Sequence, residues 1–526
     1  MAIEITRSPL RIDQLVGHER LQVLVESDII VPDDKPDIGK ILDISGRVVI
    51  NSKEVIQDKV MVEGSIKYNI LYLAEDDDKN IASIESDASF TSYLDISGVR
   101  PKMIANIKAE LEHVDCEIIN SRKTNTKAVI DMESKVYDMV QLEVIDGFGG
   151  KEHIEVLSNT IVLSYEGGRG DAQTIIRESL ELSDNMPTIV EILRRDMTIK
   201  ELECRSADNK VVINGLMDVG FLYICEDTDY PIHYFSEQIE FVHVVDIAGV
   251  YQGMDCAGDV WIEDIYIEPR EDLNGDLRLV DVEALLFFEV SAIERKHKEI
   301  ITDAYKPNGA LDVKLKDISL MEIVGEGESH EGVRESIILP ENMPRCDRVL
   351  HIDAKAVMLE QALYDDRAVI EGVIAINILY SSDEIEGIVS FKQDIPFNQT
   401  IDIEGIDSNM YCDSRVQIER MNFSLIAPDE IEFKAAVNGW VRVYDEIKVN
   451  VVVDIEEIEG LSDDQSGMFV YFVKQGDTLW SIAKQYNTTI DNILRFNDLS
   501  DGENLEIGKR IIIYNKYDYK MEEMSI

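Results

Sequence analysis

The sequence predicts a mainly β protein in which three tandem copies of one domain precede a small βααβ module. Three observations support this prediction. Sequence blocks recur at a nearly constant spacing, the recurring blocks are rich in β-branched and aromatic residues, and sustained helical periodicity is confined to a short C-terminal segment. A chain of 526 residues is also too long for a single core and suits several domains of roughly 100–200 residues each.

Each copy carries the same residues in the same order. A glycine is followed eight residues later by a tyrosine, and a proline stands 28 residues before that glycine. A second glycine, a methionine and a glutamate follow at matching places, and the period is 151 residues and then 157. In chain order these residues are Pro36, Gly64, Tyr72, Gly98, Met103 and Glu112; Pro187, Gly215, Tyr223, Gly249, Met254 and Glu263; and Pro344, Gly372, Tyr380, Gly405, Met410 and Glu419.

The three copies are expected to be sandwich- or barrel-like, because strands at roughly ten-residue spacing are separated by Asp, Asn and Gly. The first recurring glycine is expected to mark a bulge or a close backbone approach, and the recurring tyrosine to be a half-buried core residue. The predicted units are repeat 1 (1–145), repeat 2 (146–300), repeat 3 (301–453), an acidic linker (454–468), the C-terminal module (469–515) and a tail (516–526).

The chain is strongly acidic, since 104 Asp and Glu face 51 Lys and Arg and give a formal charge of −53. Such a chain repels phosphate backbones and anionic lipid, so neither nucleic acid nor a membrane is an expected partner. A basic protein surface suits it better, although solubility alone also explains the acidity. Residues 470–514 contain five Lys or Arg and six Asp or Glu, so the acidity belongs to the repeats.

No enzymatic function is expected. The six cysteines form no C-x-x-C pair, which favours reduced thiols. Eight histidines are scattered, and His113 and Cys116 have no second pair to complete a metal site, so we expect neither metal nor cofactor. The N-terminus lacks an apolar signal region and no long apolar stretch occurs, which predicts a cytoplasmic protein.

The C-terminal module is expected to have the order strand, helix, helix, strand. Asp477 or Thr478 is a candidate cap for the first helix, and Thr488 or Thr489 for the second. Alternation in the strands and i, i+3, i+4 spacing in the helices define its core. The expected core residues are Tyr471, Val473, Leu479, Ile482, Ala483, Tyr486, Ile490, Ile493, Leu494, Ile511 and Ile513.

This segment resembles a LysM domain through Y-x-V-K-x-G-D-T-L-W-x-I-A, a later Asn-x-Leu and a final Leu-x-x-Gly. The resemblance implies binding of N-acetylglucosamine polymers such as peptidoglycan. Asp477 and Thr478 are equally well explained as structural caps. The residues of the implied glycan-groove-like site are Gly476, Asp477, Thr478 and Leu479 on one wall and Asn497, Asp498 and Leu499 on the other.

The C-terminal module also contains apolar residues that its small core does not need. Trp480 lies off the apolar stripe and is therefore expected to be at least partly exposed, while other apolar residues alternate with inward ones and should form an outer sheet face. Packing on repeat 3 or the tail, or stacking on a glycan, are the alternatives to docking on a protein. The predicted partner-binding residues are Trp480, Met468, Val470, Phe472, Ile512 and Tyr514.

The repeats resemble the SPOCS domain through P-x-x-x-x-x-L, the glycine and tyrosine above, and D-I-x-G. Three such repeats before one LysM module resemble the SipL-like family of spore coat assembly proteins. This resemblance implies a non-enzymatic scaffold in the mother-cell cytoplasm, at the forespore surface, whose LysM module binds the ATPase of the coat basement layer. The alternative is a peptidoglycan-binding cortex or wall protein, and the oligomeric state stays open.

Overall fold

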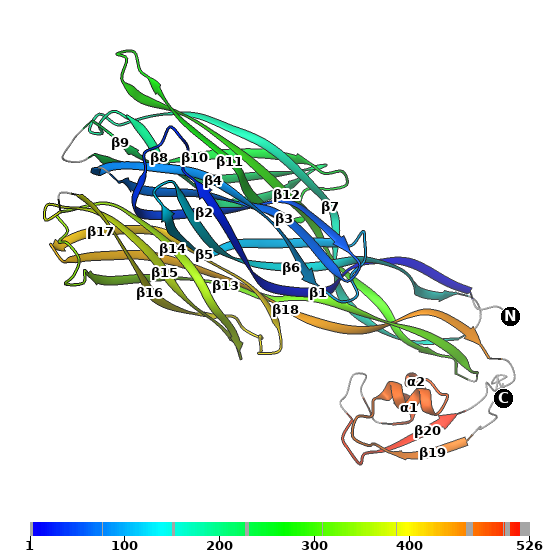
Figure 1. Ribbon diagram of the computed structural model, residues 1–526. Coiled ribbons are helices and arrows are strands. Elements are labelled where there is room, and N and C mark those ends of the chain that lie inside the picture. The colour runs from blue at the N-terminus through cyan, green and yellow to red at the C-terminus, as the bar shows by residue number, and fades with distance from the viewer. Residues whose placement is uncertain are drawn as a thin grey trace, which may run out of the picture.

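The structure is a computed structural model (Figure 1). It describes residues 4–75, 77–149, 153–226, 231–307, 309–385, 387–458, 467–497, 499 and 505–515. Most of the proposed linker, the proposed tail and Asp498 lie outside the described residues.

Each repeat consists of six antiparallel strands arranged in two three-stranded sheets, one long and one short. Repeat 1 has the orders β1-β6-β5 and β2-β3-β4, repeat 2 has β7-β12-β11 and β8-β9-β10, and repeat 3 has β13-β18-β17 and β14-β15-β16. The strands are β1 (Glu4–Ile30), β2 (Ile38–Ile56), β3 (Lys59–Ala74), β4 (Asp77–Asp95), β5 (Ile104–Asn120), β6 (Lys123–Gly149), β7 (Glu155–Glu181), β8 (Glu191–Ala207), β9 (Lys210–Ile224), β10 (Ile232–Asp246), β11 (Asp255–Glu271), β12 (Leu277–Tyr305), β13 (Leu311–Ile338), β14 (Arg348–Tyr364), β15 (Arg367–Ser382), β16 (Gly387–Asp402), β17 (Tyr411–Ala427) and β18 (Glu430–Glu457).

The two sheets of a repeat pack face to face, and each repeat has its own core, which confirms the prediction of sandwich-like repeats. In β3 buried and exposed residues alternate as in a strand with one covered face. The alternation ends at Leu71, after which both faces are buried as far as Ala74. The outer face of the short sheet is covered there by the other repeats.

The recurring tyrosines are core residues, as predicted, but they are fully rather than half buried, with 0% of each side chain exposed. Each hydroxyl donates a hydrogen bond to the carbonyl oxygen of the recurring proline of its own repeat. The three bonds join Tyr72 to Pro36, Tyr223 to Pro187 and Tyr380 to Pro344, at 2.8, 3.1 and 2.8 Å.

Both predicted roles, a bulge and a close approach, apply to the first recurring glycine. A Cβ atom at Gly215 would stand 2.3 Å from the ring of Phe241. One at Gly64 would stand 2.6 Å from the ring of Phe90 and also 2.6 Å from the backbone carbonyl oxygen of Val49. A bulge in the neighbouring strand, between Lys200 and Leu202, lies directly opposite Gly215. The glycine therefore makes room for an aromatic ring beside a bulged strand.

The three repeats contact one another through equivalent residues. In the short sheets, Leu71, Leu222 and Leu379 meet in one apolar cluster. In the long sheets, Leu10, Ile161 and Ile318 belong to a second shared cluster. Each set recurs at the repeat period, so the repeats surround a common line in an approximately threefold arrangement (Figure 1).

A charged cluster lies on this line. Its three members occupy equivalent positions, which are Asp43 in repeat 1, Arg194 in repeat 2 and His351 in repeat 3. Arg194 donates from Nη1 to Asp43 Oδ2 at 3.0 Å, and its Nη2 lies 2.8 Å from His351 Nε2. All three side chains are buried. Burial, and next the nearby guanidinium, lower the pKa of His351 to about 3, so the imidazole is neutral and Nε2 accepts a hydrogen bond from Arg194.

The C-terminal module follows the predicted order of strand, helix, helix and strand. Its elements are β19 (Gly467–Phe472), α1 (Leu479–Gln485), α2 (Ile490–Phe496) and β20 (Arg510–Asn515). Thr478 caps α1 and Thr489 caps α2, each by accepting a hydrogen bond from a backbone N–H of the first turn. The predicted inward residues of both strands and of α1 form the module's core.

Candidate partner-binding face of the C-terminal module

The module docks on the end of repeat 2 through α1. Trp480 donates from Nε1 to Asp303 Oδ2 at 2.9 Å, and Lys484 Nζ lies 2.6 Å from Asp303 Oδ1. Tyr305 donates its hydroxyl proton to the carbonyl oxygen of Thr488 at 2.7 Å and packs edge-on against the ring of Trp480, with 4.9 Å between centroids. Asp303 and Tyr305 both belong to β12, a strand of repeat 2 that continues past the predicted end of this repeat at residue 300. A long strand of repeat 2 therefore holds the module in place.

The expected exposure of Trp480 is therefore wrong, since only 9% of the residue is accessible. Its position off the α1 stripe is real, but the side chain points at β12 rather than at solvent. The spacing along a helix predicts which face a side chain occupies. It does not predict whether another domain covers that face and shields it from solvent. The packing of Trp480 is internal, and it is made with Asp303 and Tyr305 of β12.

The outer sheet face has the exposure that the alternation predicted. Met468, Val470 and Phe472 are 65%, 56% and 59% exposed, whereas Tyr471 between them is buried. On β20 the paired residues Ile512 and Tyr514 are half-buried. The strand register sets Met468 opposite Tyr514 and Val470 opposite Ile512, so these four side chains form two adjacent cross-strand pairs.

Phe496 extends this face and was not predicted from the sequence. It is the last residue of α2, is 45% exposed, and its ring centroid lies 5.2 Å from that of Tyr514. It stands two residues after Leu494 and therefore off the apolar stripe of α2, and an aromatic residue off this stripe was a signal that could have found it. We call Met468, Val470, Phe472, Phe496, Ile512 and Tyr514 the apolar sheet face.

The apolar sheet face and the docking contact lie on different sides of the module. The helices lie between the sheet and the long strands of the repeats, and the sheet lies on the far side (Figure 1). Docking through Trp480 and Lys484 therefore leaves the apolar sheet face open. A partner can reach this face without displacing the module from repeat 2.

The first wall of the glycan-groove-like site is a tight, internally bonded turn. Gly476 has a φ of +87°, which favours glycine. The Asp477 carboxylate accepts hydrogen bonds from the Lys474 backbone N–H and the Tyr471 hydroxyl, both at 2.7 Å, and these bonds lower its pKa. Thr478 caps α1 in a capping box and Leu479 is buried. All four of these residues thus have a structural role.

The second wall is also used by the fold. Asn497 Nδ2 donates to the carbonyl oxygens of Ile493 and Ile512, and Asn497 Oδ1 accepts from the Ile512 backbone N–H. Leu499 is half-buried against the module's core. The Asn497 amide thereby ties α2 to β20, and its donors and acceptor are engaged within the module.

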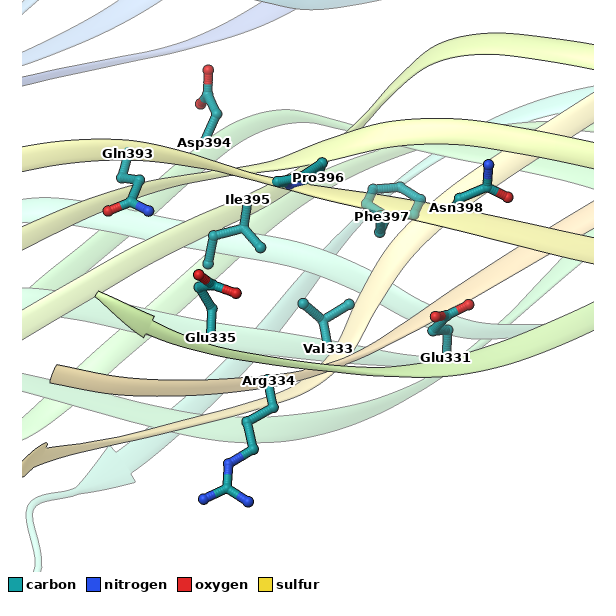
Figure 2. Close-up of a pocket in the computed structure, with 10 residues that line it drawn as sticks. All are labelled: Glu331, Val333, Arg334, Glu335, Gln393, Asp394, Ile395, Pro396, Phe397 and Asn398. Atoms are coloured by element: carbon teal, nitrogen blue, oxygen red, sulfur yellow. The ribbon is translucent and has the colours of Figure 1, made fainter. Parts of the chain in front are cut away.

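A separate cavity of about 360 Å³ lies in repeat 3, between the edges of β13 and β16 (Figure 2). Figure 2 shows Glu335 beneath Ile395 and Arg334 directed away from the opening. Val333 and Phe397 complete its apolar floor. The lining contains no histidine, cysteine, serine or lysine, so it offers no nucleophile with a neighbouring base.

No cluster of three or more His, Cys, Asp or Glu side chains in the described part of the chain is arranged to hold a metal ion. Among the described helices, none is long and apolar enough to cross a membrane.

Comparison with known proteins agrees with this architecture. The SipL, SPOCS domain family matches residues 37–119, 188–269 and 346–426, one segment in each repeat, and the LysM domain family matches residues 471–513. The cortical fragment-lytic enzyme of Bacillus subtilis (strain 168) is 46% identical over 46 residues, which are 9% of this chain and 11% of that protein. The chain thus spans about a tenth of that relative's length, and no solved structure matches.

The fold and the module together define a sporulation-related β-repeat protein that carries a binding module of the peptidoglycan-binding type. The chain is a SipL-like protein, with three SPOCS domains followed by one LysM domain. Both matched families are non-catalytic.

Proposed function

We propose that this chain is a non-enzymatic scaffold of spore coat assembly that acts in the mother-cell cytoplasm at the forespore surface. In this proposal its LysM module binds the ATPase that forms the coat basement layer. The observation that carries the proposal is the apolar sheet face, on which Met468, Val470 and Phe472 are each more than half exposed. Exposed apolar residues gathered on one small module are typical of a protein interface.

The charge distribution supports a protein partner for this module in particular. The repeats carry almost all of the formal charge of −53, while residues 470–514 are close to neutral. A neutral apolar patch at the end of a strongly acidic body presents little electrostatic repulsion to an approaching protein. The three repeats, whose strands span residues 4–149, 155–305 and 311–457, would then supply further surfaces for multivalent contacts.

A binding titration of the full chain with the purified basement-layer ATPase tests this proposal. The variant Val470→Glu places a charge in the centre of the apolar sheet face and should weaken binding by about tenfold or more. The matched control is Val242→Glu on β10, because this valine is 65% exposed and lies far from the module in sequence. Equal affinity of both folded variants and the unchanged chain would contradict the proposed face.

A second candidate function is binding of peptidoglycan, which the LysM match favours. Under this candidate the turn at Asp477 and Thr478 contacts the glycan, and sedimentation with purified peptidoglycan is the measurement. Retention in the pellet that is lost in Thr478→Ala but kept in Val470→Glu would support the glycan function. Sedimentation that neither variant changes would contradict a specific glycan groove.

A further inference from the structure

Two cysteines of repeat 2 face each other across the rim between its two sheets. Cys204 lies on β8 and Cys256 on β11, which are edge strands of different sheets. The Cys204 thiol is hydrogen-bonded to the Cys256 sulfur, to which the backbone N–H of Ser206 also donates. Both cysteines are half-buried and pack against the core of repeat 2.

A second contact holds the two edge strands together at this point. Ser206 Oγ donates to the carbonyl oxygen of Met254 at 2.7 Å and accepts from the Gly253 N–H at 3.3 Å. Each cysteine stands two residues from a partner in this contact, on the same side of its strand. The hydrogen bond between Ser206 and Met254 therefore brings the two sulfurs opposite each other, independently of any hydrogen bond between the thiols.

The pair is absent from the other two repeats. The strand registers place Lys53 and Ala105 at the equivalent positions of repeat 1. They place Gln361 and Cys412 at the equivalent positions of repeat 3. The sandwich can thus be built without the pair, so the two cysteines of repeat 2 are not a requirement of the fold.

We propose that Cys204 and Cys256 form an oxidation site at which a low-molecular-weight disulfide such as oxidised glutathione installs a bond between the two sheets of repeat 2. The Cys256 thiolate attacks one sulfur of the small disulfide, whose S–S bond breaks and releases one thiolate. The Cys204 thiolate then attacks the mixed disulfide at Cys256 and releases the second small thiolate. Two protons leave the protein, and its two thiols are oxidised while the small disulfide is reduced to two thiols.

The environment of the pair explains this order of attack. The Cys204 thiol and the Ser206 N–H both stabilise a negative charge on the Cys256 sulfur and lower the pKa of Cys256, against the effect of burial. The same hydrogen bond, together with burial, raises the pKa of Cys204. Cys204 then lies next to the mixed disulfide as the resolving thiol.

The experiment treats the folded full chain with oxidised glutathione, blocks the remaining thiols by alkylation, and maps cross-linked peptides without reduction. We expect a peptide that joins Cys204 to Cys256, the loss of two of the six free thiols, and a melting temperature higher by a few degrees. The variant Cys204→Ser should instead keep a glutathione adduct on Cys256. Cys412 should remain free in both proteins.

Repeat 3 supplies a matched positive control. The variant Gln361→Cys recreates the pair with Cys412, and the Gln361 amide oxygen is buried without a hydrogen-bond partner among the described residues, so its loss costs little. We expect this variant to form a second cross-link between repeat 3 strands. Free thiols at Cys204 and Cys256 after prolonged oxidation would overturn the proposal, whatever the Gln361→Cys variant does. Cross-linking of Cys204 or Cys256 to any other cysteine would overturn it as well.

Discussion

The hydroxyl of Tyr72 donates to the carbonyl oxygen of Pro36 at 2.8 Å, and this bond explains two sequence recurrences at once. The tyrosine ends the central strand of the short sheet, and the proline lies in the segment that enters the same sheet. In all three repeats the two residues stand 36 positions apart, and the bond is formed each time. The pair therefore fixes the entry of the chain into each sandwich.

Removal of one of these hydroxyls should destabilise the protein. Tyr72→Phe leaves the Pro36 carbonyl without its buried partner, so we expect the free energy of unfolding to fall by about 1–3 kcal/mol. Urea unfolding measures the change. Tyr93→Phe is the matched control, since this tyrosine is 50% exposed and should tolerate the change; equal effects of the two substitutions would show that the buried bond contributes little.

The recurring glycine gives a steric prediction. Gly215→Ala places a methyl group 2.3 Å from the ring of Phe241, and overpacking of this kind costs about 1–3 kcal/mol. Thermal unfolding should show a lower midpoint for this variant. The control is Gly332→Ala on β13, where the added Cβ meets nothing within 4 Å. A Gly215→Ala protein as stable as the control would mean that Phe241 moves aside freely.

The buried histidine predicts a dependence of stability on pH. Because the folded pKa of His351 is about 3 and an unfolded histidine titrates near 6.5, the unfolded chain binds the extra proton between these values. Stability is therefore lost as pH falls from about 6.5 toward 3. The groups that face the imidazole are Arg194, Tyr234, Asp353 and, through Arg194, Asp43 and Asp196.

Substitution isolates the contribution of His351 from that of the carboxylates around it. Between pH 7 and pH 5 the unchanged chain should lose roughly 2 kcal/mol more stability than His351→Gln, as measured by urea unfolding at both pH values. His297→Gln, at an exposed position, should keep the pH dependence of the unchanged chain. Parallel losses in all three proteins would mean that His351 titrates normally in the folded state.

The docking contact predicts a spectroscopic change. Asp303→Asn weakens the acceptor of both Trp480 and Lys484, so the module should leave β12 more often and expose the indole. In a background with Trp261 and Trp440 replaced by phenylalanine, the fluorescence of Trp480 should shift to longer wavelength. Asp95→Asn in repeat 1, which removes only the exposed partner of Lys59, should leave the emission unchanged; an identical spectrum for Asp303→Asn would contradict the contact.

The sequence predicts those features that depend on neighbours close along the chain. Alternation identified Met468, Val470 and Phe472 as one exposed row, and helix spacing identified Ile482 and Ala483 as core, because these patterns express one sheet or one helix. Trp480 was predicted wrongly because its cover comes from β12, which lies far away in the sequence. The cluster of Asp43, Arg194 and His351 gave no signal, since its equivalent positions carry three different side chains.

The cluster of Asp43, Arg194 and His351 has a consequence for assembly. If three copies of repeat 2 were to associate in the same way, three guanidinium groups would meet at one buried point with only their own Asp196 carboxylates to balance them, and three copies of repeat 1 would bring three Asp43 carboxylates together without a guanidinium. Repeats 1 and 2 therefore match each other better than they match their own duplicates. The buried charges are paired within one chain, so growth of any larger lattice has to start from other surfaces of the molecule.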